Sequence, residues 1–252
     1  MCLILFALQQ HDDYPLIVIA NRDEYYARPT QAAHWWPDLN ILAGRDLEAR
    51  GTWMGVNKNG HFAAVTNVRE ANGVQARLSR GKLTRDFLSS SEPAESFLTN
   101  LEPTADSYAG FNLIVGDSSG LYFYSNRHAG IRCIPPGIYG VSNGLFDEAW
   151  PKLISGKQAL TATLKTSLDN SALMQILTDS TTAEDEQLPK TGVPLDIERM
   201  LSSRFIRSNE YGTRACSMVK FTNRGQIIFA EQNYDSNGIT GSLAVEEFQV
   251  ES

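Results

Sequence analysis

The chain has 252 residues, of which 42% are hydrophobic and 20% are charged, so it is long and apolar enough to bury a core of its own. The net charge is −7 and no basic block occurs, which argues against nucleic acid or an anionic membrane surface as a general partner. The three cysteines are widely spaced and include no CxxC pair, which favours a reducing compartment and gives no sign of structural zinc.

The chain opens on an apolar run from Cys2 to Leu8, which polar residues end at once. The run is too short to span a membrane and lacks the basic segment of a signal peptide. No later stretch approaches membrane-spanning length. We therefore expect a soluble, cytoplasmic protein without an integral membrane segment.

Two β-rich apolar runs, residues 2–8 and 16–21, flank a polar turn. Because neither run alternates apolar with polar residues, we expect a hairpin whose strands are buried on both faces. Residues 25–50 are then expected to form a long loop with a short strand at Ile41–Ala43. Loops of this length are functional or disordered, and the two tryptophans in this one argue against disorder.

Three further hairpins are predicted, because a glycine closes each of their turns. Their strands are residues 52–56 with 61–66, 111–116 with 121–124, and 215–221 with 226–230, and single strands are expected at 138–142 and 243–250. Helices are expected at residues 82–89, 93–101, 147–164, 171–178 and 196–203, and residues 179–193 read as an exposed linker or flap. Strands at both ends with helices between them predict antiparallel sheets with helices layered outside.

Cys2 is the first candidate for chemistry. If Met1 is removed, as the small side chain of Cys2 permits, the chain begins with an α-amine beside a thiol, the two groups that an N-terminal nucleophile needs. The alternative is that Cys2 is a small buried residue at the start of a strand.

The second apolar run ends in Asn21-Arg22-Asp23-Glu24, and the predicted hairpin brings this strand end near Cys2. A guanidinium close to the thiol would lower its pKa from about 8.5. A carboxylate would orient the terminal ammonium. The alternative is an ordinary surface ion pair, worth at most about 1 kcal/mol.

Two asparagines at predicted strand ends, Asn67 and Asn143, are candidates to bind an oxyanion. Such a contact is worth about 3–4 kcal/mol in acyl-transfer sites, although a turn or cap is the commoner role of a single asparagine. Arg214 follows Tyr211-Gly212-Thr213 and is either a clamp for a substrate anion or a surface arginine. The four histidines are scattered and no nucleotide or metalloprotease motif occurs, so no metal site is expected.

The order and number of several motifs resemble those of the NRDE/TANGO2 family (transport and Golgi organization protein 2). These motifs are Met1-Cys2, Ala20-Asn21-Arg22-Asp23-Glu24, Gly44-Arg45-Asp46, Gly51-Thr52-Trp53-Met54-Gly55-Val56-Asn57 with Asn59-Gly60, Thr66-Asn67-Val68-Arg69, and Tyr211-Gly212-Thr213-Arg214.

A more distant resemblance is to N-terminal nucleophile hydrolases of the choloylglycine hydrolase and penicillin V acylase type. Cys2 matches their nucleophile, and Asn67 and Asn143 are similar in context to their two asparagines. The segment Ser203-Arg204-Phe205-Ile206-Arg207 resembles their arginine segment, which makes Arg204 a competitor to Arg214.

The strand end departs from that pattern, because Asn21 precedes Arg22 here. Either of the two is a candidate for the place of the hydrolase arginine. Either Asp23 or Glu24 is likewise a candidate for the place of its aspartate.

Together the resemblances imply one domain over residues 1–252 with an α+β fold, the four-layer αββα sandwich of N-terminal nucleophile (Ntn) hydrolases. They imply a hydrolase or acyltransferase that acts on an amide or thioester of an acyl ligand. Cys2 would be the nucleophile, and no cofactor would be required.

The NRDE/TANGO2 resemblance also implies an alternative from another class, a non-catalytic protein that binds and traffics haem or acyl-CoA inside the cell. Cys2, His34, Trp35 and Trp36 are its candidate contacts, and without a CxxCH motif any haem would be non-covalent. A histidine beside two tryptophans is more often a structural anchor. A third interpretation makes the Trp35-Trp36 loop the contact surface of an interaction module. The sequence leaves substrate and oligomeric state open.

Overall fold

The computed structural model describes residues 2–70 and 76–251, which form two compact units. Unit 1 comprises residues 2–27 and 136–248, and unit 2 comprises residues 28–70, 76–135 and 249–251. Neither unit is a continuous stretch of chain, because each is built from segments far apart in the sequence.

Unit 1 contains a six-stranded sheet with the strand order β10-β1-β2-β11-β12-β13. The strands are β1 (Cys2–Leu8), β2 (Leu16–Tyr25), β10 (Gly137–Val141), β11 (Tyr211–Phe221), β12 (Gln226–Asp235) and β13 (Gly238–Gln249). The predicted hairpin of β1 and β2 is confirmed, with Leu8 opposite Leu16 and Cys2 opposite Arg22. β10 and β11 add to its two sides, both antiparallel, so the apolar N-terminal strands lie inside the sheet.

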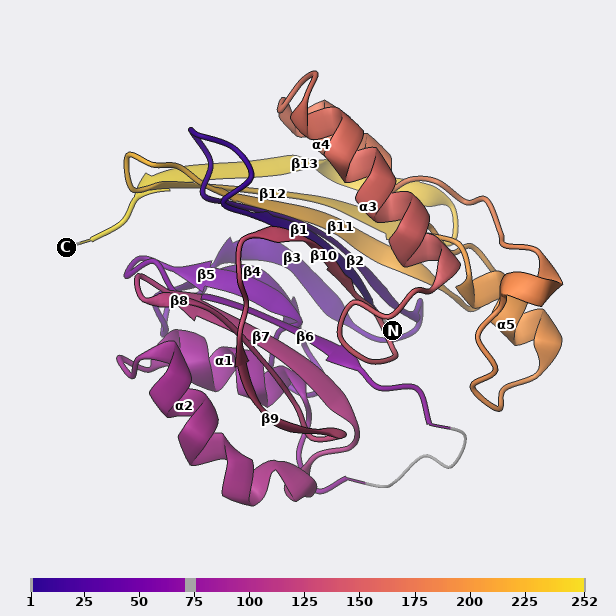
Figure 1. Cartoon of the computed structure of the whole chain (residues 1–252), viewed down its shortest axis with the longest axis horizontal. Helices are drawn as coiled ribbons and strands as arrows, with labels where there is room; N and C mark the ends of the chain where they lie inside the picture. Colours follow the sequence, from indigo (N-terminus) through magenta and orange to yellow (C-terminus); the bar gives the residue numbers. More distant parts are fainter. Residues whose placement is uncertain (1, 71–75, 252) are drawn as a thin grey trace. The chain divides into compact units, whose positions relative to one another are not determined.

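Helices cover one face of this sheet (Figure 1). They are α3 (Pro151–Leu164) and α4 (Asn170–Ile176), followed by the short helix η2 (Asp185–Gln187) and by α5 (Leu195–Leu201). The core beneath them joins Leu3 and Ile19 of the sheet to Leu153 and Leu160 of α3. Because successive strand residues point to opposite faces, odd-numbered residues of β1 and β2 face the helices.

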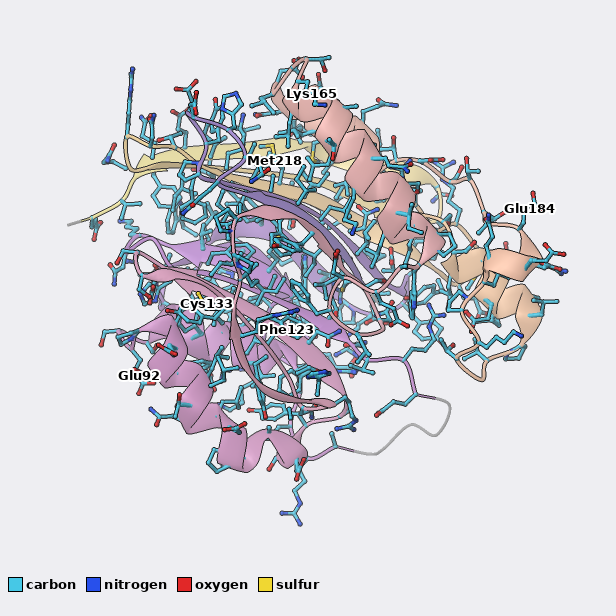
Figure 2. The ribbon with its side chains drawn as sticks, viewed as in Figure 1. Glu92, Phe123, Cys133, Lys165, Glu184 and Met218 are labelled. Atoms are coloured by element: carbon cyan, nitrogen blue, oxygen red, sulfur yellow. The ribbon has the colours of Figure 1, made fainter. Side chains whose placement is uncertain are left out.

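In unit 1, apolar side chains fill the core between sheet and helices, and charged side chains lie on the outer surface of the helices. Met218 of β11 is buried in this core, whereas Lys165 and Glu184 project outward from the helical layer (Figure 2).

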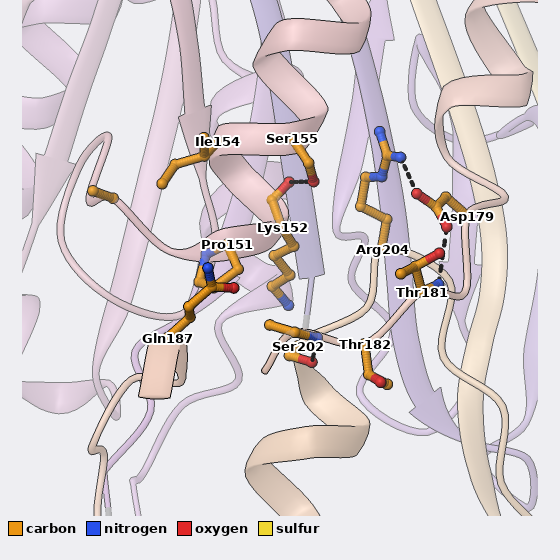
Figure 3. A pocket seen from close by; sticks show the side chains of 12 residues that line it. Pro151, Lys152, Ile154, Ser155, Asp179, Thr181, Thr182, Gln187, Ser202 and Arg204 are labelled. Atoms are coloured by element: carbon orange, nitrogen blue, oxygen red, sulfur yellow. Dashed lines mark hydrogen bonds and ion pairs between the residues drawn. The ribbon is translucent and has the colours of Figure 1, made fainter. Parts of the chain in front are cut away.

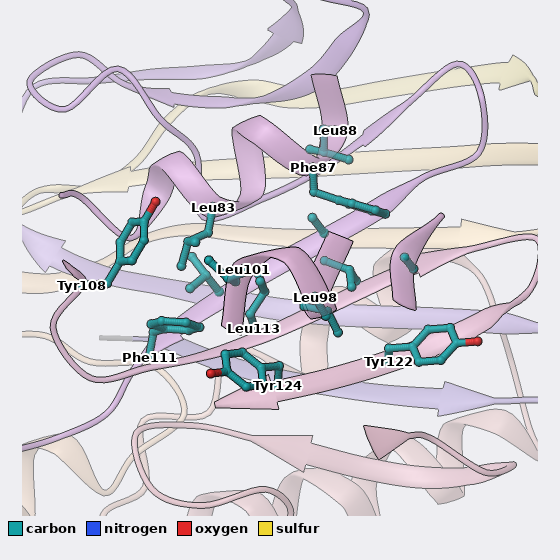
Figure 4. Close-up of a cluster of buried hydrophobic side chains, with 14 of the residues drawn as sticks. Leu83, Phe87, Leu88, Leu98, Leu101, Tyr108, Phe111, Leu113, Tyr122 and Tyr124 are labelled. Atoms are coloured by element: carbon teal, nitrogen blue, oxygen red, sulfur yellow. The ribbon is translucent and has the colours of Figure 1, made fainter. Parts of the chain in front are cut away.

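Unit 2 contains a seven-stranded antiparallel sheet with its strands in chain order. They are β3 (Thr30–Trp35), β4 (Ile41–Asp46), β5 (Met54–Asn57), β6 (Phe62–Asn67), β7 (Phe111–Asp117), β8 (Gly120–Ser125) and β9 (His128–Cys133). The helices α1 (Gly81–Ser89) and α2 (Ala94–Leu101), with η1 (Glu102–Ser107), pack on it through a core that includes Phe87, Leu98 and Phe111 (Figure 4).

Three expectations need correction. The loop predicted for residues 25–50 contains the unpredicted strand β3, which pairs with β4, and β9 was not predicted at all. The short strand predicted at Ile41–Ala43 is confirmed as part of β4. Helix α3 begins at Pro151 rather than at residue 147, because proline suits the first helical position. Asp147 instead takes a left-handed backbone conformation, where its carboxylate accepts from Gly140 N and Lys157 Nζ.

No helix within residues 2–70 and 76–251 is long and apolar enough to cross a membrane.

Candidate functional site

The start of β1 carries Cys2, directly opposite Arg22 of β2 in the antiparallel ladder. Residues opposite each other in such a ladder project to the same face of the sheet. The side chain of Arg22 is only 5% exposed, so its charge is held close to the thiol. The predicted approach of this strand end to Cys2 is therefore confirmed.

The four residues Asn21-Arg22-Asp23-Glu24 alternate between the two faces of the sheet. Arg22 and Glu24 share the face of Cys2, and their side chains approach to 4.0 Å. Asn21 faces the helices, because its Nδ2 donates to the carbonyl oxygens of Leu177 at 2.9 Å and Arg204 at 2.7 Å.

Asp23 lies on the same helix-covered face as Asn21. The Oγ1 of Thr213 donates to Asp23 Oδ1 at 2.8 Å. Burial raises the pKa of the Asp23 carboxyl, and the positive charge of Lys152 opposes this rise. Asp23 is thus a buried carboxyl group that the fold holds in place.

Burial also raises the pKa of the Cys2 thiol above its ordinary value. The negative charges of Asp23 and Glu24 act in the same direction, whereas Arg22 acts against them. The expected influence of the guanidinium is present, but burial outweighs it. Cys2, which is half-buried and free of any disulfide, is therefore a neutral thiol at neutral pH and needs a base to become a nucleophile.

The segment after β10 flanks Cys2 on its other side. β10 pairs with β1 through Val141 opposite Ile4, so the next residues run past the start of β1. Ser142 Oγ donates to the backbone oxygen of Cys2 at 3.0 Å and lies 3.3 Å from Asn143 Oδ1. Asn143 is buried directly after Ser142, and its role at an oxyanion stays a prediction.

The two candidate arginines lie on different faces. Arg214 sits at an irregularity of β11, and its Nη1 donates to the carbonyl oxygens of Tyr25 and Tyr26 at 2.9 and 3.1 Å. Burial and then the like charge of Arg22 lower the pKa of Arg214. Arg204 instead lies on the helix-covered face, where it forms an ion pair with Asp179. A substrate contact for either arginine stays a prediction.

Sequence reasoning missed two residues whose charges or pKa values are coupled to Asp23. Tyr211, which entered only as part of a motif, is half-buried, and its pKa is raised first by burial and then by the charges of Asp23, Cys2 and Glu24. Lys152, in the first turn of α3, is only 3% exposed. A lysine between Pro151 and an apolar helical residue was its only signal in the sequence.

The remaining candidates belong to unit 2. Asn67 ends β6 opposite Phe111, and its role at an oxyanion stays a prediction. Trp36 is a structural anchor, because its Nε1 donates to Ala43 O at 3.0 Å and the guanidinium of Arg45 lies 4.4 Å from its ring centroid.

The segment around Trp36 borders a shallow hollow of about 420 Å³, which Trp35 and Lys58 also line. Within it, Lys58 Nζ lies 5.6 Å from the ring centroid of Trp35. His34 is half-buried, and its Nδ1 pairs with Ala32 O at 2.8 Å. A haem contact by these residues stays a prediction. No group of three His, Cys, Asp or Glu side chains within the described ranges is placed to hold a metal ion.

The comparison with known families bears directly on this site. The family model described as "Transport and Golgi organisation 2" matches residues 1–236. The chain belongs to this family. The resemblance inferred from the motifs is thereby confirmed.

Curated relatives agree with this assignment over almost the whole chain. The transport and Golgi organization protein 2 homolog of Homo sapiens is 32% identical over 92% of this chain and 93% of its own length. The homolog of Bos taurus is 31% identical over 100% of both chains.

Among solved structures, a mutant of conjugated bile acid hydrolase from Clostridium perfringens matches with a TM-score of 0.55, at 11% identity over 99% of this chain and 97% of that chain. At that level of identity the likeness concerns the fold alone. It confirms the expected α+β fold of the Ntn hydrolase type.

Proposed function

We propose that this member of the Transport and Golgi organisation 2 family is a Cys2-dependent hydrolase or acyltransferase that acts on an amide or thioester of an acyl ligand. The observation that carries the proposal is the position of Cys2 at the first residue of β1. There it lies opposite the buried Arg22, and Ser142 Oγ donates to its backbone oxygen.

Removal of Met1 would give Cys2 a free α-amine with an ordinary pKa of about 7.7–8.0. Because burial keeps the thiol protonated, this amine is the base that the reaction requires. It takes the thiol proton, and the thiolate sulfur attacks the acyl carbonyl carbon. The leaving nitrogen or sulfur then takes the proton back as its bond to the acyl carbon breaks.

The resulting acyl-enzyme is a thioester on Cys2. Water attacks it in a hydrolase and a second nucleophile attacks it in an acyltransferase, and either step returns the thiol. In the proposed mechanism Asn143 Nδ2 donates to the oxyanion of each tetrahedral intermediate. Arg22 favours the thiolate. In the proposed mechanism Glu24 and Asp23 stabilise the ammonium that forms when the amine takes the thiol proton.

The direct test is intact mass spectrometry of the purified protein before and after incubation with acyl amides and acyl-CoA thioesters. We expect loss of Met1, an acyl adduct on the wild type, and no adduct or turnover with Cys2→Ala. Cys133→Ala, which removes an exposed thiol in unit 2, is the matched control and should behave as wild type. Unchanged turnover in Cys2→Ala, or Met1 retained in active protein, would contradict the proposal.

The raised pKa of Cys2 favours a second candidate, a carrier that binds an acyl-CoA or haem without chemistry. A neutral thiol in a half-buried position suits binding of an apolar ligand as well as it suits catalysis. This candidate predicts stoichiometric, saturable binding with no product. Titration with haem should then give a Soret shift that His34→Ala removes, whereas flat calorimetry with acyl-CoA would exclude the acyl-CoA carrier.

A further inference from the structure

Strand β13, yellow in Figure 1, is the last strand on one side of the sheet in unit 1. Among the described strands only β12 pairs with it, so the backbone groups on its outer side have no strand partner. It is 12 residues long, whereas strands usually have about 5–6 residues. It contains neither proline nor lysine, which commonly protect an exposed edge from pairing. An edge of this length is therefore open to a further strand.

The same strand exposes apolar side chains. Ile239, Leu243 and Val245 are 68%, 42% and 48% exposed. Because Leu243 and Val245 are two residues apart in a strand, they project to the same face of the sheet. A partner strand that removes them from water would be stabilised by the hydrophobic effect.

The helical layer of unit 1 leaves β13 uncovered. The core beneath the helices takes its buried sheet residues from β1, β2, β11 and β12, and none of its described members lies on β13. Elsewhere in this layer, part of the predicted linker or flap at residues 179–193 lines a hollow of about 460 Å³ (Figure 3). Arg204 and Asp179 in that hollow form an ion pair with each other. That charged lining is thus engaged within the chain, unlike the outer edge of β13.

The middle of β13 is complementary to a second copy of itself. Residues 242–246 read Ser-Leu-Ala-Val-Glu. If two copies pair antiparallel with Ala244 opposite the partner's Ala244, Leu243 lies opposite the partner's Val245. Ser242 then lies opposite the partner's Glu246, where its hydroxyl can donate to the carboxylate. The two-fold symmetry forms each of these contacts twice.

The charges of β13 favour this register over others. Glu246 and Glu247 are both exposed near the end of the strand, and a register centred on either would place like charges opposite each other. With Ala244 at the centre, Glu246 is four residues along the strand from the partner's Glu246, which is about 14 Å. Gly241, whose φ of 70° departs from strand geometry, limits the pairing segment on the other side.

We propose that two copies of this chain associate through β13, with Ala244 opposite the partner's Ala244, so that their sheets become continuous. Pairing of one edge strand is a small interface, so the dimer should dissociate on dilution. The dimer is independent of the chemistry proposed for Cys2.

Disulfide trapping of the full-length chain tests the register. The background is Cys133→Ser, which removes the exposed thiol. Residues opposite each other in an antiparallel pair have Cα atoms about 4.5–5.5 Å apart, within reach of a disulfide. Ala244→Cys should therefore give a covalent dimer under mild oxidation, whereas Ser242→Cys, which lies four residues from its own copy, should not. No covalent dimer with Ala244→Cys, or equal trapping of both variants, would overturn the proposal.

Sedimentation equilibrium tests the charges at the same pair of positions. We expect a monomer–dimer equilibrium for wild type, and Ser242→Glu should weaken it about tenfold because a carboxylate then opposes the partner's Glu246. Adding Glu246→Lys to that variant should restore the dimer, since opposite charges then face each other. Ser155→Glu, the same change at an exposed position of α3, is the control and should associate as wild type does. A wild type that is monomeric at every concentration, or a double variant that does not recover the dimer, would refute the proposal.

Discussion

The four residues Asn21-Arg22-Asp23-Glu24 have different roles on the two faces of the sheet in unit 1. Asn21 ties the sheet to the backbone of Leu177 and Arg204, and Asp23 accepts from Thr213, so both serve the packing of the helical side. Arg22 and Glu24 lie on the thiol side, and their charges act on the Cys2 thiol together with that of Asp23. A motif that looks continuous in the sequence is therefore divided by the alternation of a strand.

The pKa of Cys2 gives a prediction at this scale. In protein that retains Met1, we expect alkylation of Cys2 by iodoacetamide to rise with pH through a pKa above the ordinary value of about 8.5, because burial outweighs Arg22. Arg22→Gln should raise this pKa further, since it removes the positive charge opposite the thiol.

Peptide mass spectrometry separates Cys2 from the other two thiols, and Cys133→Ser removes the exposed one. Arg199→Gln, an equal change of charge on the surface of α5, should leave the alkylation profile unchanged. An alkylation pKa of Cys2 below about 8.5 in wild type would contradict the prediction.

Asp23 and Asp179 predict opposite pH dependences of stability. Because the pKa of Asp23 is raised in the folded protein, its protonated carboxyl contributes to the free energy of unfolding. This contribution is complete below the unfolded pKa of about 3.9 and is lost as pH rises through the folded pKa. We therefore expect the unfolding free energy of Asp23→Asn to increase relative to wild type as pH rises above about 4.

Asp179 has the reverse sign, because its pKa is lowered to about 2. The contribution of its carboxylate to the free energy of unfolding is present above the unfolded pKa of about 3.9. It is lost as pH falls through the pKa of the folded protein. Asp179→Asn should thus lose stability relative to wild type as pH rises from about 2 to about 4. Urea unfolding from about pH 2 to about pH 8 covers both windows. Parallel pH curves for wild type and either variant would refute the corresponding prediction.

At the scale of elements, apolar runs and helix signals were sufficient to predict most of the strands and helices. The unbroken apolar runs predicted β1 and β2, and Pro93 marked the start of α2 within one residue. The runs failed for β3 and β9, whose residues are mostly exposed or half-buried and carry no apolar pattern. Such strands form because a neighbouring strand provides partners for their backbone hydrogen bonds. The local pattern of apolar and polar residues does not reveal that pairing.

The candidate site likewise contains residues whose positions the sequence predicts and residues whose positions it does not. The hairpin rule predicted that Arg22 lies beside Cys2, because the pairing is local. The position of Arg204 behind the sheet depends on Asn21 and Asp179, which are 183 and 25 residues away from it. Only tertiary structure could distinguish it from Arg214.

Helix α1 gives a prediction about packing. A Cβ at Gly51 would lie 2.4 Å from the backbone carbon and oxygen of Gly81, the first residue of α1. Because backbone atoms have little freedom to move, Gly51→Ala should lower the unfolding free energy by about 3 kcal/mol.

Gly130→Ala is the matched control in the same unit. A Cβ there meets no atom within 4 Å, so only its positive φ of 85° opposes the change. It should cost about 1–2 kcal/mol. Chemical denaturation of both variants measures the difference, and a smaller effect at Gly51 than at Gly130 would show that α1 moves to accept the methyl group.

At the scale of the whole molecule, the course of the chain links the two units. The sheet of unit 1 closes only when β10 and β11 reach β1 and β2, after the whole of residues 28–135 has been made. The end of the chain then returns to unit 2, where Glu251 N donates to Lys58 O at 2.8 Å. Pairing across such sequence distances predicts slow folding.

This connectivity supports the proposal that residues 1–252 form one domain, which predicts a single cooperative unfolding transition. Trp150→Phe makes the test sharp, because it weakens the core of unit 1 and leaves Trp35, Trp36 and Trp53 as fluorescent reporters in unit 2. Far-UV circular dichroism reports both units. If the units unfold together, fluorescence and dichroism will show the same midpoint in urea, and both midpoints will fall together relative to wild type. A dichroism change that precedes the fluorescence change would show that unit 1 unfolds separately and would contradict the single domain.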